Sequence, residues 1–194
     1  LMGPTASGKT ELAIEISKRI NSKLISVDSA LIYRGMDIGT AKPSKEILKS
    51  HPHELVDICE PDDSFSVTEF ISLAKKHIKS ALAEGKLPIL VGGTSFYFNA
   101  LEHGLSELPA STDESRKHFN DLLRSEGSEK LHSKLVEIDP QSAARIHSND
   151  SQRVTRALEV FHLSGEALSK LQGKKNQNKL DLNIKKIVLM PDRA

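Results

Sequence analysis

Apolar residues change their spacing along the chain, and this change divides the sequence into two parts. Up to about residue 103, short β-rich runs at residues 24–28, 55–58 and 87–91 alternate with helical patterns. The first helical pattern contains Leu12, Ile16 and Ile20 at the period of an α-helix, with charged residues between them. The alternation predicts an α/β fold in which a parallel sheet carries helices on both faces.

Turn and cap residues set the bounds of the elements in this first part. Ser66 and Glu69 form a capping-box pattern that predicts a helix over residues 66–84, and Gly85 is suited to end it. Residues 29–43 are polar and contain two glycines, so they predict a loop or a broken helix.

The second part of the chain shows helical periodicity only. Between residues 111 and 171, Asp139 and Asp150 are placed as helix N-caps and Gly165 as a helix end. A polar link follows at residues 173–181, and residues 187–189 predict a strand that returns to the sheet. We therefore expect a core of residues 1–103 with 182–194, and an all-helical insertion with its linker at residues 104–181.

Composition and charge exclude several classes of protein. The 194 residues carry 27 Lys and Arg against 26 Asp and Glu, and a net charge of +1 argues against a uniformly basic surface for nucleic acid. Aromatic residues make up only 4%, too few for a wide stacking platform. No apolar run reaches the ~18 residues of a membrane helix, so we expect no membrane partner. The single cysteine, Cys59, excludes an intramolecular disulfide and suits a reducing compartment, the cytoplasm.

The strongest chemical signal is a glycine-rich motif close to the start of the chain. Its glycines allow backbone N–H groups to surround phosphate oxygens, and the helix that follows adds its positive end. The lysine supplies a charge for the terminal phosphate, and the threonine hydroxyl is suited to ligate Mg²⁺. The motif predicts a P-loop-type sheet that binds a phosphate or diphosphate group, ATP included, through Gly3, Pro4, Thr5, Ala6, Ser7, Gly8, Lys9 and Thr10.

Two polar residues follow predicted strands, where parallel sheets commonly place their ligand contacts. Asp28 ends the run 24–28 and is suited to bind Mg²⁺ through water or to act as a general base. A turn-capping role is the alternative. Thr94 follows a second glycine pair, and helix capping is equally compatible with its position. Asp57 lies inside its apolar run, so we interpret it as a paired or capping carboxylate.

Arg153 and Arg156 are three residues apart in a predicted helix, next to Gln152. This spacing places both guanidinium groups on one face, where they could contact phosphates or bases. On spacing alone, a solvated helix face is the stronger interpretation.

Long segments narrow the possible classes of P-loop protein. GPTASGKT occupies residues 3–10, SVDSALIYRGMDIGTAKP residues 26–43, LVGGTSFYF residues 90–98 and NDSQRVTRALE residues 149–159. In this order they closely resemble the bacterial tRNA isopentenyltransferase family, the tRNA dimethylallyltransferases. The resemblance covers nearly the whole chain. A small-molecule kinase, which would bind ATP tightly, and a non-catalytic RNA-binding module remain the rival hypotheses.

The resemblance implies transfer of a dimethylallyl group from dimethylallyl diphosphate to N6 of the adenosine immediately 3′ of the tRNA anticodon, with release of diphosphate. Asp28 would take the N6 proton or orient the amine, and Thr94 would bond near the reacting centre. The P-loop would then hold the leaving diphosphate, with Mg²⁺ on Thr10. The implied contacts with the anticodon stem-loop are Asp28, Ser29, Ala30, Leu31, Arg116, Gln152, Arg153, Val154, Thr155 and Arg156.

The sequence also departs from the family it resembles. Ser95 and Phe96 occupy positions where family members often carry larger apolar residues. A downstream Gly-Tyr-Arg segment and the last helices of the family have no counterpart. Only Leu1 and Met2 precede the glycine motif, and the chain stops just after the predicted last strand, so we expect a fragment of a longer protein, incomplete at both ends. We also expect a monomer.

Overall fold

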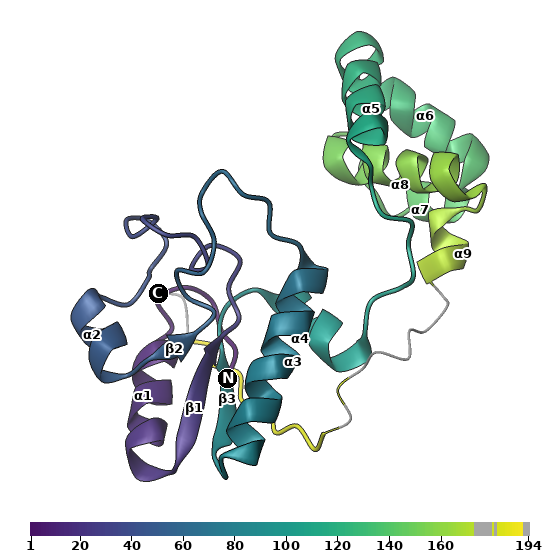
Figure 1. Ribbon diagram of the computed structural model, residues 1–194. Helices are drawn as coiled ribbons and strands as arrows, with labels where there is room; N and C mark the ends of the chain where they lie inside the picture. The colour runs from purple at the N-terminus through teal and green to yellow at the C-terminus, as the bar shows by residue number, and fades with distance from the viewer. Residues whose placement is uncertain (173–179, 181, 192–194) are drawn as a thin grey trace. The chain divides into compact units, whose positions relative to one another are not determined.

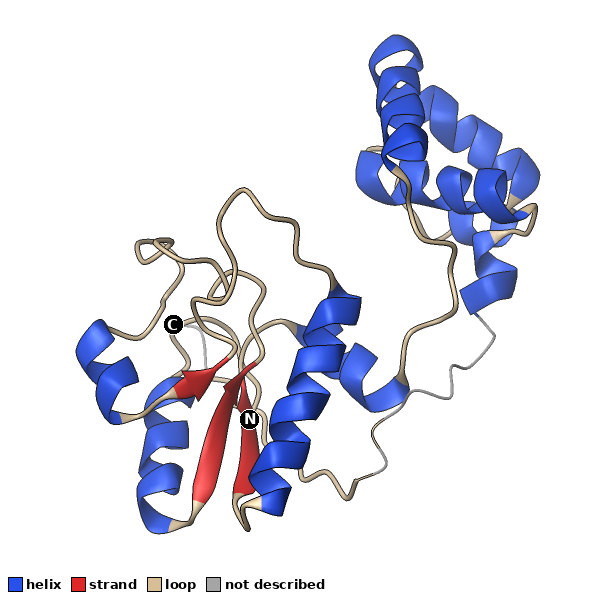
Figure 2. Ribbon diagram, in the orientation of Figure 1, coloured by secondary structure: helices blue, strands red, loops and turns tan. Residues whose placement is uncertain are grey.

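The computed structural model describes residues 1–172, 180 and 182–191, and the chain divides into two compact units. One unit comprises Leu1–His103 with Lys179–Ala194, and the other comprises Gly104–Asn178. The first is an α/β unit with a small parallel sheet (Figures 1 and 2). Its elements are α1 (Lys9–Arg19), β1 (Ser22–Ser26), α2 (Lys45–Ser50), β2 (His53–Glu54), α3 (Val67–Ala83), β3 (Leu87–Val91) and α4 (Ser95–His103).

The three strands run parallel in the order β2-β1-β3. Ser26 at the end of β1 lies opposite Val91 at the end of β3, so both strands deliver the following residues to one edge. Leu1 donates its terminal N–H to Leu90 O at 2.7 Å, and Met2 forms parallel bridges with Gly92 and Val188. The start of the chain therefore lies between the end of β3 and the residues around Val188.

Side chains alternate across β1, and this alternation gives the sheet two buried faces. Ile25 and Val27 pack with α3 and α4, where Phe70 and Tyr97 stack with ring centroids 4.4 Å apart. Leu24 faces the other way and packs with Ala13 and Ile14 of α1. Helices therefore cover both faces of the sheet, as the alternation of patterns predicts (Figure 1).

The predicted strand at residues 55–58 is wrong. The strand is β2, which ends at Glu54, and Leu55 and Asp57 have left-handed φ values of 65° and 53°. A strand cannot continue through such backbone, because extended residues need negative φ. The run instead bonds to the loop after β1: Asp57 N donates to Leu31 O at 3.1 Å and Ile58 N to Ile32 O at 2.8 Å.

The predicted return strand at residues 187–189 is confirmed in place but not in length. Met2 N donates to Ile187 O and Leu189 N donates to Met2 O, both at 2.8 Å, around a single bridge at Val188. The polar link at residues 173–181 lies outside the described residues apart from Leu180. The structure also contains α2, which the apolar spacing does not predict.

The second unit is a cluster of helices with its own core (Figure 1). Leu131, Leu135 and Val154 are fully buried at its centre. Asp139 and Asp150 cap α7 and α8, and Gly165 ends α8 in a left-handed conformation, all as predicted. The helices are α5 (Asp113–Glu126), α6 (Ser128–Ile138), α7 (Pro140–Ala143), α8 (Ser151–Ser164) and α9 (Leu168–Gln172). Within the described part of the chain, no helix combines the length and apolar character needed to cross a membrane.

Candidate functional site

Residues 3–8 form a loop, here called the glycine loop, that leads from the sheet into α1. The helix begins at Lys9, and Gly8 precedes it with a left-handed φ of 78°. Lys9 Nζ donates to Pro4 O at 2.8 Å, so the ammonium group folds back over the loop. A helix N-terminus of this kind presents free N–H groups and the positive end of its dipole.

The glycine loop is closely packed at its entry. A Cβ atom on Gly3 would lie 2.7 Å from Ser7 Oγ and 2.8 Å from Leu189 O, so only glycine fits there. Ser7 Oγ is buried and has no hydrogen-bond partner among the described residues. Ala6 has a left-handed φ of 61°, an uncommon conformation for a residue with a side chain. The loop is thus held in a strained, preformed turn.

Asp28 follows β1 and has one carboxylate oxygen on the side of Gly93. Its Oδ1 accepts from Ala30 N at 2.9 Å and from Leu31 N at 3.4 Å. Those bonds fix the carboxylate, and Oδ2 lies on the side of Gly93, 3.9 Å from where a Cβ of Gly93 would stand. The turn-capping role therefore holds for Oδ1, and the site role of Asp28 stays a prediction.

Gly92 and Gly93 bring three segments together. A Cβ on Gly92 would lie 2.0 Å from Val27 O, which makes glycine obligatory for the close approach to β1. A Cβ on Gly93 would lie 3.4 Å from Gly3 O and 3.9 Å from both Asp28 Oδ2 and Lys9 Nζ. Gly93 therefore lies next to the glycine loop, the Asp28 carboxylate and the Lys9 ammonium group.

Thr94 joins the second glycine turn to the segment after Asp28. Its Oγ1 accepts from Ser29 N at 3.0 Å and lies 3.4 Å from Ser29 Oγ. Its carbonyl oxygen accepts from Tyr97 N and Phe98 N at the start of α4. Thr94 therefore lies at the start of α4, and its side chain contacts the Asp28 segment. Its role near the reacting centre stays a prediction.

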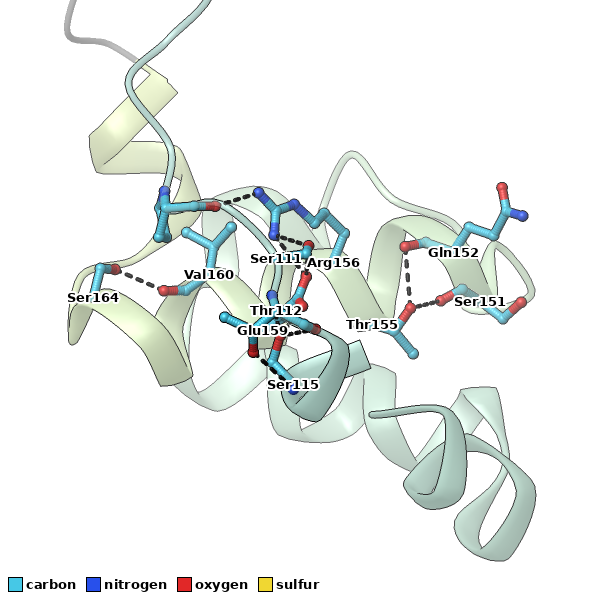
Figure 3. Close-up of polar contacts among 11 residues, drawn as sticks. Ser111, Thr112, Ser115, Ser151, Gln152, Thr155, Arg156, Glu159, Val160 and Ser164 are labelled. Carbon is cyan, nitrogen blue, oxygen red and sulfur yellow. Dashed lines mark hydrogen bonds and ion pairs between the residues drawn. The ribbon is translucent and has the colours of Figure 1, made fainter. Parts of the chain in front are cut away.

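The five residues of α8 that are predicted as RNA contacts differ in exposure. Arg153 is 76% exposed and pairs with Asp150 at 3.1 Å, and Gln152 is also exposed. Thr155 Oγ1 donates to Ser151 O at 2.7 Å, within its own helix (Figure 3). Val154 is 0% exposed in the core of the second unit, so its side chain is not available to a ligand.

Arg156 is engaged inside the second unit (Figure 3). One of its nitrogens, Nη1, donates to Ser111 Oγ at 2.7 Å and to Glu159 Oε2 at 2.6 Å, and the other, Nη2, donates to Pro109 O at 2.7 Å. The same helix thus carries one exposed guanidinium group, that of Arg153, and one that is bonded within the unit, that of Arg156. Arg116, on α5, is 59% exposed and lies 3.7 Å from Asp113.

Glu159 explains why Arg156 is held. Its carboxylate is 4% exposed and accepts from Ser111 and Ser115 as well as from Arg156. Burial alone would raise the pKa of Glu159, but these hydrogen bonds outweigh it and hold the pKa below its usual value. The arginine therefore balances a buried carboxylate, an arrangement that residue spacing does not reveal.

Asp57 is an ion-paired carboxylate and Cys59 is a buried thiol. Asp57 accepts from Lys42 Nζ at 2.6 Å, which confirms it as a paired carboxylate. Cys59 is 9% exposed, and burial raises the pKa of its thiol, which disfavours the reactive thiolate. Lys42, the partner of Asp57, was not singled out from the sequence, since one lysine in a polar loop carries no distinctive signal.

Known proteins match this chain along its whole length. A family model described as IPP transferase matches residues 31–194. The tRNA dimethylallyltransferase of Ruthia magnifica subsp. Calyptogena magnifica is 62% identical over 194 residues, which is all of this chain and 63% of that protein. A second tRNA dimethylallyltransferase, from Vesicomyosocius okutanii subsp. Calyptogena okutanii, shows the same identity and coverage. The chain thus spans 63% of the length of these curated relatives.

One solved structure with a related fold is the full-length tRNA isopentenylpyrophosphate transferase of Bacillus halodurans. It is 46% identical, with a TM-score of 0.53 over 85% of this chain and 55% of that one. A eukaryotic dimethylallyltransferase acting on tRNA is 26% identical, with a TM-score of 0.69 over 92% of this chain and 46% of that one. The family match over residues 31–194 and the identity along the whole chain show that this protein belongs to the IPP transferase family.

Proposed function

We propose that the protein transfers a dimethylallyl group from dimethylallyl diphosphate to N6 of the adenosine immediately 3′ of the anticodon in tRNA. The observation that carries the proposal is that Lys9 Nζ and Asp28 Oδ2 both lie 3.9 Å from the Cβ position of Gly93. This arrangement supports an anion-binding loop beside a carboxylate. The relatives' names, tRNA dimethylallyltransferase, support the same reaction.

The glycine loop is proposed to act as a P-loop that holds the diphosphate. The left-handed Gly8, the start of α1 and the Lys9 ammonium all favour a polyphosphate at this point. The buried Ser7 hydroxyl, which has no partner in the described structure, is a further donor on the loop. Charge that develops on the leaving diphosphate would be stabilised there as the carbon–oxygen bond breaks.

Mg²⁺ is the proposed cofactor, and the oxygen ligands present fit it. Thr10 would supply the ligating hydroxyl, in the first turn of α1. No group of three metal-ligating side chains occurs among the described residues. Such a sparse set suits Mg²⁺, which keeps several waters and binds through one or two protein oxygens and substrate phosphates. When bound, it would add positive charge to the diphosphate.

Asp28 is the proposed proton acceptor. The N6 lone pair attacks the first carbon of the dimethylallyl group, the bond from that carbon to the diphosphate oxygen breaks, and one N6 proton moves to the carboxylate. The two backbone bonds to Oδ1 hold the carboxylate in position, which leaves Oδ2 for this transfer. Thr94 would orient the reacting group from the adjacent helix start.

The tRNA anticodon stem-loop is the proposed partner, in the cytoplasm. The adenosine must leave its stack to reach the donor. Residues 28–31 would line its entry, and the helical insertion at residues 104–181 would bind the stem-loop. Arg153, Gln152 and Arg116 are proposed as contacts because they are exposed, whereas Val154 is left out because it is buried. We retain a monomer as the proposed state.

The proposal is tested by incubating the protein with dimethylallyl diphosphate and an anticodon stem-loop. The predicted product carries one added dimethylallyl group on the adenosine 3′ of the anticodon, seen by mass spectrometry of the digested RNA. In a parallel titration dimethylallyl diphosphate should displace inorganic pyrophosphate at lower concentration than ATP does. Tight ATP binding with phosphate transfer and no prenylated product would instead identify a kinase.

A further inference from the structure

Lys42 lies at the end of the loop after β1 and is almost completely enclosed. Its side chain is 2% exposed, and its Nζ donates to Tyr33 O at 2.7 Å. The same ammonium pairs with Asp57 Oδ1 at 2.6 Å and with Asp37 Oδ1 at 2.9 Å. Three donors thus meet three acceptors, which satisfies the hydrogen-bonding capacity of the group.

The three acceptors of Lys42 come from two segments that are separated in the sequence by α2 and β2. Tyr33 and Asp37 belong to the loop after β1, and Asp57 belongs to the run that follows β2. Asp57 adopts a left-handed φ of 53° at the point where its carboxylate meets the lysine. Non-glycine residues hold such a conformation only when their surroundings determine it. The Lys42 contact is one such constraint.

A line of backbone hydrogen bonds leads from this contact to Asp28. Ile58 N donates to Ile32 O at 2.8 Å, and Asp57 N donates to Leu31 O at 3.1 Å. Leu31 N in turn donates to Asp28 Oδ1 at 3.4 Å. The position of the Asp28 carboxylate therefore depends on the backbone path of residues 30–33. Lys42 holds the end of this segment through its hydrogen bond with Tyr33 O.

We propose that Lys42 is a positioning residue that sets the geometry of the Asp28 segment for the RNA substrate, without itself contacting the diphosphate. The inference rests on the proposed function, because it assigns the Asp28 segment to the tRNA side of the reaction. It commits the loop of residues 29–43 to a single arrangement before the substrate arrives.

The electrostatics support a permanently charged Lys42. Burial alone would lower the pKa of this lysine, but the hydrogen bonds with Asp57 and Asp37 outweigh it and raise the pKa. The same contact with Lys42 holds the pKa of Asp37 below its usual value. A neutral side chain at this position would leave two carboxylates facing each other across the loop, and these would drive the segments apart.

The experiment compares Lys42→Met with Lys49→Met, which removes the same charge from an exposed position in α2. Lys42→Met should raise the KM for the anticodon stem-loop on the order of 10-fold, with the affinity for inorganic pyrophosphate unchanged. Hydrogen exchange should accelerate at the amides of Asp57 and Ile58, and at the amide of Arg34, which donates to Cys59 O at 2.9 Å. Lys49→Met should leave all three measurements at the wild-type level.

Asp57→Asn keeps the inference testable if Lys42→Met does not fold, since its side chain is 40% exposed and milder to change. It should raise the same KM, and the double variant should be less impaired than the two single effects multiplied. Unchanged KM and unchanged exchange in both single variants would overturn the positioning role. Absence of any transfer by the wild type would refute the proposed function instead, and the exchange comparison would still decide the role of Lys42.

Discussion

Gly92 and Gly93 are neighbours in sequence, but a methyl group on each would meet different surroundings. On Gly92 it would lie 2.0 Å from Val27 O, a backbone atom of the strand extension that cannot move aside. On Gly93 it would stand at ordinary contact distances, 3.4 Å or more, from Gly3 O, Asp28 Oδ2 and Lys9 Nζ. One glycine is required by the fold, and the other leaves space between the candidate site groups.

We therefore predict opposite outcomes for the two alanine variants. Gly92→Ala should lower the free energy of unfolding by about 3 kcal/mol or more, because the sheet must shift to accept it. Gly93→Ala should change stability by less than about 1 kcal/mol, yet reduce transfer about 100-fold by occupying the site. Urea unfolding and single-turnover transfer measure the two effects. A stable, fully active Gly93→Ala would show that this space is not used.

Arg153 and Arg156 form a second pair for comparison. Arg153→Ala should leave stability within about 0.5 kcal/mol, weaken stem-loop binding, and reduce the salt slope of binding by about 1. Arg156→Ala should cost on the order of 2 kcal/mol of stability, because it leaves the buried Glu159 without its cation. Binding titrations at several salt concentrations and thermal unfolding separate the two roles. The assignment fails if Arg153→Ala unfolds the helices and Arg156→Ala affects only RNA binding.

At the scale of elements, Asp139 ties α7 to α9. It is 2% exposed, and it accepts from Ser142 N at 3.0 Å and from Ser169 N at 2.9 Å. Burial would raise the pKa of Asp139, but these hydrogen bonds outweigh it and lower the pKa below the usual 3.8. Because the folded state favours the ionised form, this carboxylate stabilises the helical unit above pH 3.8.

The stabilisation by Asp139 should be lost as the pH falls through its lowered pKa, where the carboxylate becomes protonated in the folded state. Asp139→Asn should cost about 1–3 kcal/mol at pH 7, and the difference from wild type should shrink towards zero in acid. Denaturant unfolding of both proteins between pH 3 and pH 7 measures it. Asp121→Asn, at an exposed position of α5, should change stability by less than about 0.5 kcal/mol. A difference that stays constant with pH would contradict the account.

The sequence predicts those elements whose local signals agree with the fold. The capping box of Ser66 and Glu69 opens α3, and Asp139 and Asp150 cap their helices, because capping depends on residues within one turn. The predicted strand at residues 55–58 is wrong because the backbone is left-handed at Leu55 and Asp57, and Asp57 is bonded to Leu31 and Lys42. Apolar spacing carries no information on such tertiary constraints.

The candidate site shows the same division. Asp28 and Thr94 could be found because parallel strands end at one edge of the sheet, and Lys9 because the glycine pattern is long. Gly93 and Lys42 could not, because their importance lies in what surrounds them: the space beside one and the enclosure of the other. The hydrogen bonds of Arg156 cannot be predicted for the same reason. One partner, Glu159, is 3 residues away, but the other, Ser111, is 45 residues away in the sequence.

At the scale of the whole molecule, the two units have separate cores and different proposed tasks. The glycine loop, Asp28 and Thr94 all belong to the α/β unit, and the exposed Arg153 belongs to the helical one. A net charge of +1 gives no overall attraction for RNA. RNA binding would depend on individual exposed cations. Substitutions in the helical unit should therefore change the affinity for RNA, and substitutions in the α/β unit should change the rate of transfer.

The most direct measurement is single-turnover transfer of the dimethylallyl group to an anticodon stem-loop by wild type and Asp28→Asn. The asparagine keeps an oxygen for the amides of Ala30 and Leu31 but cannot accept the N6 proton. We predict a rate lower by about 10²- to 10⁴-fold, with the affinity for inorganic pyrophosphate unchanged. An Asp28→Asn protein that transfers the group at the wild-type rate would contradict the assignment of this site.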